Sequence, residues 1–139
     1  MIDQSRIRDK IDFIRRNLRI LRELAQVPQE VFEYGSTEYH AAVRLLQISI
    51  EAMIDVGAHI VSREGLGTPK TYAEVFDLLA NAGIIPASFS RKAKTMTRFR
   101  NRAVHLYDEV SADQVHDILQ HGLVDFDEFI HYVVSKYLS

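Results

Sequence analysis

The chain contains at residues 37–64 the stretch TEYHAAVRLLQISIEAMIDVGAHIVSRE, and this stretch decides the fold class. Gly35 and Ser36 break the chain before it, and as a helix it would be roughly 40 Å long. Its apolar residues point in nearly every direction around the helix: Ala42, Val43, Leu45, Leu46, Ile48, Ile50, Ala52, Met53, Ile54, Val56, Ile60 and Val61. A helix that is apolar on several sides is packed on several sides, so we expect it at the centre of a bundle or at a subunit interface.

Helical periodicity also dominates the rest of the chain. Ile7, Ile11, Ile14, Leu18 and Leu21 form one apolar stripe at steps of four and three, which predicts a first helix ending near Pro28. Further helices are predicted from capping signals and apolar spacing at about 71–83, 86–105 and 111–133. Four or five helices joined by short loops predict an all-α fold, an antiparallel four- to five-helix bundle in a single domain over residues 1–139.

Composition excludes several classes of protein. The 139 residues are 47% hydrophobic and 26% charged, the balance of an ordinary globular protein. The chain has no cysteine, which excludes disulfides, thiolate zinc sites, thiol nucleophiles and iron–sulfur clusters. No run approaches the roughly 20 apolar residues of a membrane span, and the start of the chain does not read as a signal peptide. We therefore expect a cytoplasmic protein with no membrane association.

The net charge of −2 conceals two basic clusters. Between Leu78 and Tyr107 there is no acid, and the cations there are Arg91, Lys92, Lys94, Arg98, Arg100 and Arg102. The second cluster comprises Arg6, Arg8, Lys10, Arg15, Arg16, Arg19 and Arg22. Such clusters can attract polyanions. They can equally be solvated helix faces whose charge balances that of acidic faces elsewhere, and composition leaves both interpretations open.

The segment that ends the fourth predicted helix collects the residues with useful chemistry. At helical spacing Asn101 and His105 are stacked at i, i+4, with Arg98 and Arg102 beside them on one face. Arg100 lies about 140° away from His105 on a regular helix. The two could meet at one site only if Arg100 reaches around, if the helix loosens near His105, or if a second subunit contributes.

These residue types suit cleavage of RNA without a metal. A histidine titrates near neutral pH, so it can take a proton from a ribose 2′-hydroxyl or give one to the departing 5′-oxygen. An arginine holds phosphate with two hydrogen bonds and stabilises the charge of a five-coordinate phosphorus. Asn101 could orient the histidine or bind phosphate. The alternative is a surface helix held by salt bridges.

The pattern Arg100-Asn101-x-x-x-His105-x-Tyr107 resembles the signature of the HEPN superfamily, and the final tyrosine resembles its HepT branch. The resemblance extends along the chain. Residues 51–60 after Gln47 are similar to the long second helix of that family, and the loop at 65–67, residues 76–79 and residues 123–129 follow in the family's order.

The resemblance implies a metal-independent endoribonuclease toxin that needs no cofactor and forms a homodimer. Two Arg–His pairs would then face each other across a shared cleft. It also implies a partner, an MntA-type nucleotidyltransferase antitoxin that adenylylates the motif tyrosine, which by position is Tyr107. A bulky adenylyl phosphodiester there would fill the cleft and repel RNA phosphate. Tyr107 could otherwise be an ordinary half-buried aromatic residue.

The roles that follow are His105 as general acid and base, Arg100 as phosphate stabiliser and Asn101 as their support. Arg98 and Arg102 would bind RNA. Two other functions remain open: a catalytically silent HEPN module that binds RNA or the antitoxin, and a helical bundle that serves only to pair with the nucleotidyltransferase.

Polar residues also recur every four positions along the second helix, at Gln47, Glu51, Asp55, His59 and Arg63. This row is a polar seam, or it supports the site by letting Glu51 or Asp55 pair with Arg100 or orient His105.

Other candidate sites are weaker. His116, His121 and His131 lack the i, i+3 or i, i+4 spacing of a helical metal site, so no metal site is expected. The Gly65-x-Gly67 sequence follows a helix without a Lys-Ser/Thr pair, so it predicts a turn rather than a phosphate loop.

Overall fold

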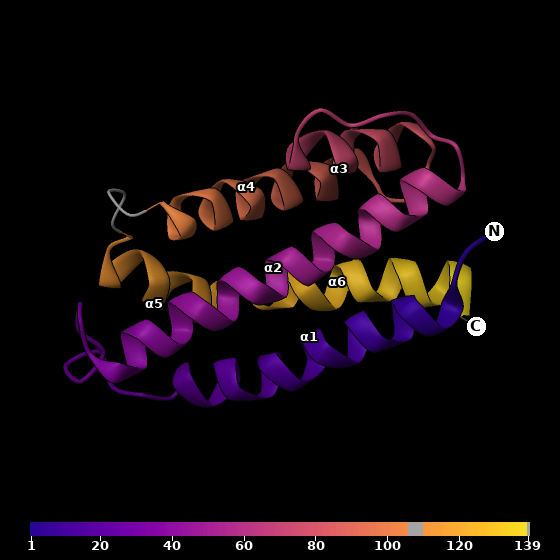
Figure 1. The fold of residues 1–139 in the computed structure, drawn as a ribbon. Coiled ribbons are helices and arrows are strands. Elements are labelled where there is room, and N and C mark those ends of the chain that lie inside the picture. Colours follow the sequence, from indigo (N-terminus) through magenta and orange to yellow (C-terminus); the bar gives the residue numbers. More distant parts are fainter. Residues whose placement is uncertain (106–109, 139) are drawn as a thin grey trace.

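The computed structural model describes residues 1–105 and 110–138, and these residues form helices and no strand. The helices are α1 (Gln4–Leu24), α2 (Thr37–Arg63), α3 (Tyr72–Asn81), α4 (Ala87–Val104), α5 (Ala112–His121), α6 (Val124–Val133) and a π-helical turn, η1 (Val134–Leu138). In Figure 1, α1 runs beside α2, α3 and α4 lie along the other side of α2, and both chain termini are at the same end. The predicted all-helical bundle is confirmed.

Helix α2 lies at the centre of this bundle. It packs against α1, α3, α4 and α5, and residues such as Leu46, Met53 and Ile60 are almost completely buried. Inside the contact with α1, Asn17 donates a buried 3.1 Å hydrogen bond to Ser49. α2 is long and apolar enough to cross a membrane, but 61% of the relevant window is buried inside the bundle. That burial is typical of a core helix, and the expected central position of α2 is confirmed.

Gly57 allows α3 to approach α2 closely. A Cβ atom at this position would lie 2.8 Å from Cγ1 of Val75 and 3.3 Å from Cδ1 of Leu79. Any side chain at Gly57 would therefore push α3 away from α2. This contact sets the position of the start of α3, which carries a residue of the candidate site.

Side-chain caps start three helices where the sequence predicts them. Ser36, Thr71 and Ser111 accept hydrogen bonds from the first turns of α2, α3 and α5. Thr71 and Glu74 have the spacing of a capping box, but Glu74 accepts from the backbone N–H of Lys70 and not from that of Thr71. These caps explain why the expected helix starts agree with the structure.

The fifth predicted helix, at 111–133, is in fact two helices separated at Gly122 and Leu123. The Gly122 N–H still bonds the carbonyl of Ile118, but a Cβ on Gly122 would lie only 3.1 Å from that oxygen. The chain then turns, and α6 packs Phe126 and Phe129 inward. Apolar spacing continues across the break because both pieces face the same core, which is why periodicity alone indicated one helix.

Candidate active site on helix α4

Arg100 is held by residues from two other helices. Its Nε donates to Oε2 of Glu51 on α2 at 2.9 Å, and its guanidinium carbon lies 5.0 Å from the ring centre of Tyr72, the first residue of α3. The Arg100 side chain is 19% exposed and that of Glu51 is 33% exposed. A planar cation that is paired on its edge and stacked on its face has little freedom left, so its position is defined before any ligand arrives.

Glu51 is kept ionised by its surroundings. Burial raises the pKa of its carboxyl, but hydrogen bonds from Gln47 and Arg100 and the charges of Arg100 and Arg44 together hold the pKa below its ordinary value. The Gln47 amide donates to the same Oε2 atom at 3.1 Å. Asp55, the other acid considered from the sequence, instead pairs with Lys10 of α1 at 3.0 Å. Glu51 and Gln47 therefore support Arg100, and Asp55 does not.

Asn101 and His105 follow on the same segment, and both are exposed. Oδ1 of Asn101 accepts a hydrogen bond from the Arg100 guanidinium at 3.3 Å. His105 is the C-cap residue of α4, with extended backbone angles of φ −80° and ψ 129°. The helix ends at Val104, but the φ of His105 is still near the helical value, so its Cα–Cβ bond stays close to the helical direction, and the ψ of 129° redirects only the chain that follows. The separation of about 140° from Arg100 therefore remains, and a shared site needs the reach of Arg100 or a second subunit.

Arg98 and Arg102 lie on another face of α4 from Arg100. Arg98 donates to Oγ1 of Thr95 at 3.0 Å, and Arg102 donates to Oε1 of Gln114 on α5 at 3.1 Å. Both arginines are exposed. The candidate RNA-binding cations thus line the side of α4 that faces α5, while Arg100 faces α2 and α3.

Tyr107 lies outside the described residues. Val110, which precedes α5, is buried, and its carbonyl accepts a hydrogen bond from the Tyr39 hydroxyl of α2. This contact attaches the start of α5 to the same central helix that carries Glu51.

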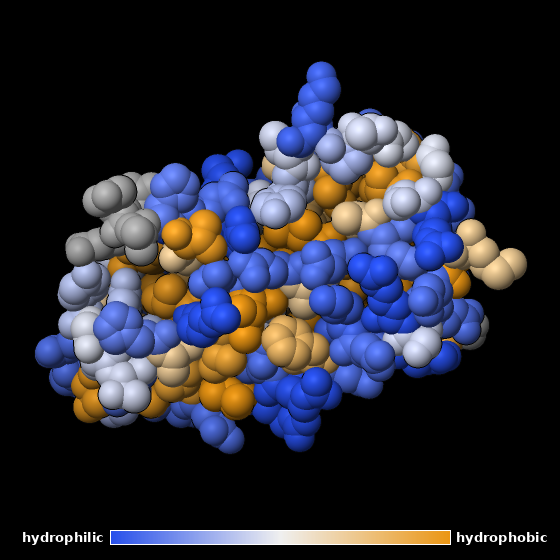
Figure 2. Space-filling model, in the orientation of Figure 1, coloured by the Kyte–Doolittle hydropathy of each residue, from blue (hydrophilic) through white to orange (hydrophobic). Residues whose placement is uncertain are grey.

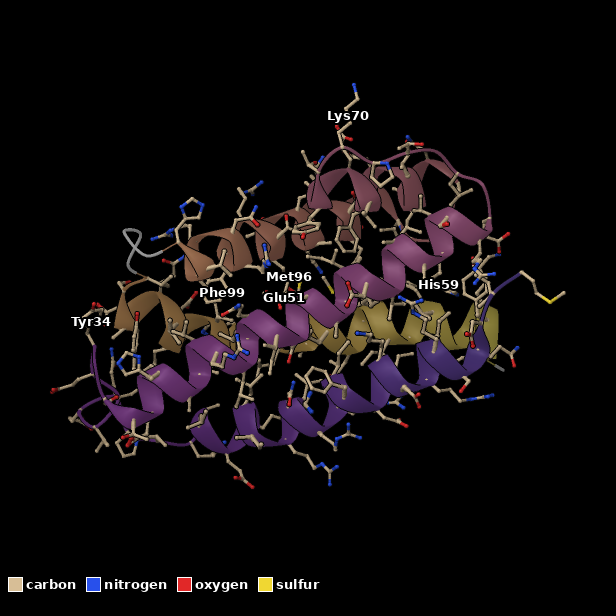
Figure 3. All side chains as sticks on the ribbon, in the orientation of Figure 1. Tyr34, Glu51, His59, Lys70, Met96 and Phe99 are labelled. Carbon is tan, nitrogen blue, oxygen red and sulfur yellow. The ribbon has the colours of Figure 1, made fainter. Side chains whose placement is uncertain are left out.

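Two contributors were not expected from the sequence. Tyr72 lies 28 positions before Arg100 in the sequence, and no spacing rule connects the two residues. The same holds for Gln114 of α5 and its partner Arg102. Figure 3 labels Glu51 on α2 and Met96 and Phe99 on α4, the two helices that the Glu51–Arg100 bond joins. In the described part of the chain, no cluster of three or more histidine or acidic side chains is arranged to hold a metal ion.

The described site agrees with the HEPN resemblance of the sequence, since Arg100 is held by Glu51 and Tyr72 and precedes an exposed histidine at the end of α4. Residues 14–133 match the family model described as "Ribonuclease HepT-like". The chain belongs to this ribonuclease HepT-like family.

Individual relatives agree with the family match. The chain is 33% identical over 131 residues to the mRNA nuclease HepT of Shewanella oneidensis, covering 90% of this chain and 98% of the relative. It is 25% identical over 133 residues to the tRNA nuclease HepT of Aphanizomenon flos-aquae, covering 96% and 90%. Among solved structures, the tri-AMPylated Shewanella oneidensis HEPN toxin in complex with MNT antitoxin matches with a TM-score of 0.88 and 32% identity, over 98% of this chain and 100% of that one.

Proposed function

We propose that this chain is the toxin of a toxin–antitoxin pair and cleaves RNA without a metal or other cofactor. It would act in the cytoplasm as a single HEPN-like domain. The observation that carries the proposal is Arg100, a cation fixed by Glu51 and Tyr72 and followed by an exposed histidine at the helix end. The names of both nuclease relatives support the same activity, although one is a nuclease of mRNA and the other of tRNA.

The proposed reaction is attack of a ribose 2′-oxygen on the adjacent phosphorus. His105 takes the 2′-hydroxyl proton as the new O–P bond forms, and a protonated histidine gives a proton to the departing 5′-oxygen. The products are a 2′,3′-cyclic phosphate and a 5′-hydroxyl. Arg100 has N–H groups beyond the two that bond Glu51 and Asn101, and these can bind the equatorial phosphate oxygens as their charge increases.

Glu51 and Asn101 are positioning residues in this scheme. A bond to Nε and a stacked tyrosine hold the guanidinium in one plane, so that its position requires no reorganisation during the reaction. The ionised Glu51 carboxylate also moderates the charge of Arg100, which would otherwise bind the product phosphate more strongly.

We infer a homodimer in which two Arg100–His105 pairs face a common cleft. Each pair lies at the exposed end of one helix, where one chain offers few groups to surround an RNA phosphate. The N-terminal half of α2 leaves Val43, Leu45 and Ile48 partly exposed, and Figure 2 displays hydrophobic side chains at the surface over this part of the helix. Apolar surface of this kind is available for a contact between subunits.

The proposed partner is an MntA-type nucleotidyltransferase antitoxin that adenylylates Tyr107. Support comes from the structural relative, a toxin that carries AMP groups and is bound to its antitoxin. An adenylyl phosphodiester two residues after His105 would bring a negative charge and a purine ring next to the site. Both would hinder the approach of an RNA phosphate.

The test is incubation of the purified chain with structured RNA in excess chelator. We expect cleavage with 2′,3′-cyclic phosphate ends in the presence of chelator, and its loss in His105→Ala. Cleavage that stops on chelation, or that survives in His105→Ala, contradicts the proposed mechanism. Salt-sensitive RNA binding without any product would instead assign the chain as a silent binding module.

A further inference from the structure

A groove separates α4 from α5 and α6, on the side of α4 that carries Arg98 and Arg102. We call it the α4–α5 groove. Its volume is about 550 Å³, within the range of pockets that bind small molecules. Buried core residues form its floor, namely Leu46, Ile50, Phe99 and Phe126, while Met96 of α4 and Ile118 of α5 are the partly exposed apolar residues of its walls.

The polar rim of the groove has opposite charges on its two walls. Lys92, Arg98 and Arg102 line the α4 wall, while Asp117 of α5 and Asp125 of α6 line the other. The bond between Arg102 and Gln114 joins the two walls. A ligand that fits this arrangement has an apolar body, negative charge along one side and N–H donors along the other.

Asp125 is the most unusual residue of the rim. Its side chain is only 23% exposed, and its one ion-pair partner among the described residues is Lys92, whose Nζ is 4.0 Å away. That ammonium lies closer to Glu128, at 3.1 Å, and no other described residue donates a hydrogen bond to the Asp125 carboxylate. Burial raises the pKa of Asp125, only partly offset by the charge of Lys92. The carboxylate therefore has acceptor capacity that the fold leaves unused.

A nucleotide within an RNA strand has the required features. Its base is flat and packs on apolar and sulfur-containing side chains such as Met96 and Ile118, which are partly exposed in the groove. Its flanking phosphates suit the arginines of the α4 wall. Cytosine, adenine and guanine carry an exocyclic amino group that can donate to a carboxylate. Uracil has no amino group, and its one N–H is flanked by two carbonyl oxygens that repel a carboxylate.

We propose that the α4–α5 groove binds one nucleotide of the RNA substrate and selects a base with an exocyclic amino group through Asp125. The base lies against Met96 and Ile118, and the phosphates on either side contact Arg98 and Arg102. This inference rests on the proposed function, since RNA is its ligand. It adds a base-specific subsite, which the Arg100–His105 pair does not supply.

The experiment measures binding of fluorescent rC8 and rU8 to the His105→Ala protein, which keeps both RNAs intact. These two octamers differ at the edge that Asp125 would read. We expect rC8 to bind at least about 5-fold tighter than rU8. In the Asp125→Asn background the ratio should fall to within about 2-fold, because an amide N–H can donate to the carbonyl oxygens of uracil.

The matched control is Asp127→Asn, two residues further along α6. Asp127 pairs with Arg22 of α1 and does not line the groove, so the rC8-to-rU8 ratio should be unchanged. Thermal melting checks that both variants fold. Equal binding of the two octamers, or a ratio that Asp125→Asn does not change, overturns the proposal.

Two further measurements separate this inference from its alternatives. If Asp125→Asn alters self-association in sedimentation velocity and leaves the base preference unchanged, a second copy of the chain occupies the groove and the proposal is wrong. If the chain with His105 intact cuts no RNA but the base preference is present, the nuclease function fails and the subsite stands. If the chain cuts RNA but has no base preference, only the subsite fails.

Discussion

Helices α1 and α4 carry similar numbers of cations, but the cations differ in exposure and in the residues that surround them. On α1, Arg6, Arg8, Arg15, Arg16, Arg19 and Arg22 are all exposed. Where α1 cations form salt bridges, they pair at the surface, as Lys10 does with Asp55 and Arg22 with Asp127. On α4, Arg100 is largely buried between Glu51 and Tyr72, and Arg98 and Arg102 border a groove with an apolar lining.

The difference lies in what surrounds each charge. An exposed ion pair adds little to the stability of the fold, because water screens the two charges and both side chains lose conformational freedom. A partly buried guanidinium with two fixed neighbours keeps its direction, so it can meet a ligand without reorganisation. Charge density alone therefore does not identify the functional surface. If this contrast is right, substitutions on α4 should change RNA binding and cleavage, while substitutions on α1 should change only stability.

The largest expected effect separates the two helices directly. Arg100→Ala should lower the cleavage rate by about 10²- to 10³-fold, because it removes the cation proposed to stabilise the phosphorane. Arg16→Ala on α1 should leave the rate within about 2-fold, since that side chain is exposed. Single-turnover cleavage of one RNA measures both. Equal losses in the two variants would contradict the contrast between α1 and α4.

Glu51→Gln tests whether the position of Arg100 matters as well as its charge. We expect a fall of about 10-fold in kcat with a smaller change in KM, because the guanidinium loses its charged partner but remains present. Asp55→Asn, one turn along the same helix, is the matched control and should retain full activity. An effect confined to melting temperature would assign Glu51 a structural role only.

The groove-side arginines should affect binding more than chemistry. Arg98→Ala and Arg102→Ala should each weaken RNA binding several-fold and reduce the slope of log K against log salt by about 1, if each contacts one phosphate. Arg19→Ala on α1 should leave that slope unchanged. Titrations of His105→Ala protein with RNA at several salt concentrations measure the affinity and the slope. An equal reduction of the slope in Arg19→Ala would mean that RNA also contacts α1.

The smallest effect concerns the folding role of α1. Nε2 of His59 accepts a 3.0 Å hydrogen bond from the backbone N–H of Asp3, the N-cap of α1, so the acceptor nitrogen must be unprotonated. Burial, followed by the charges of Arg63 and Arg6, lowers the pKa of His59 from its ordinary 6.5. His59→Ala should lower the free energy of unfolding by about 1 kcal/mol at pH 7.

The pH dependence of that effect has a definite sign. Because the folded pKa lies below the unfolded one, the unfolded chain binds the proton more readily as the pH falls. The stabilisation by neutral His59 is complete above pH 6.5 and declines as the pH drops toward the lowered value. Denaturant unfolding of wild type and His59→Ala at pH 7 and pH 5 should therefore give a smaller difference at pH 5. A constant or growing difference would contradict this account.

Much of the fold was predictable from local signals. The starts of α2, α3 and α5 follow from Ser36, Thr71 and Ser111, whose side chains cap helices by contacts within one turn. The central place of α2 follows from its apolar residues on several sides. The break at Gly122 was missed because the residues on both sides face one core, so their spacing continues without a visible interruption.

The candidate site was predictable only in part. Arg100, Asn101 and His105 are neighbours in the chain, so spacing and resemblance sufficed to select them. The sequence left Glu51 and Asp55 as equal alternatives, and only the packing of α4 on α2 distinguishes them. Tyr72 was not expected at all, because its contact with Arg100 depends on how closely α3 approaches α2 at Gly57.

The amino-acid sequence by itself determined the helices, the core stripe of each helix and the run of motif residues, because helix formation, capping and amphipathic spacing act over a few neighbouring positions. The tertiary structure decided which acid faces Arg100, which aromatic ring covers it, and that α4 and α5 leave a groove between them. These contacts join residues that are far apart in the chain. They depend on how closely the helices pack and at what angle, which no local pattern specifies.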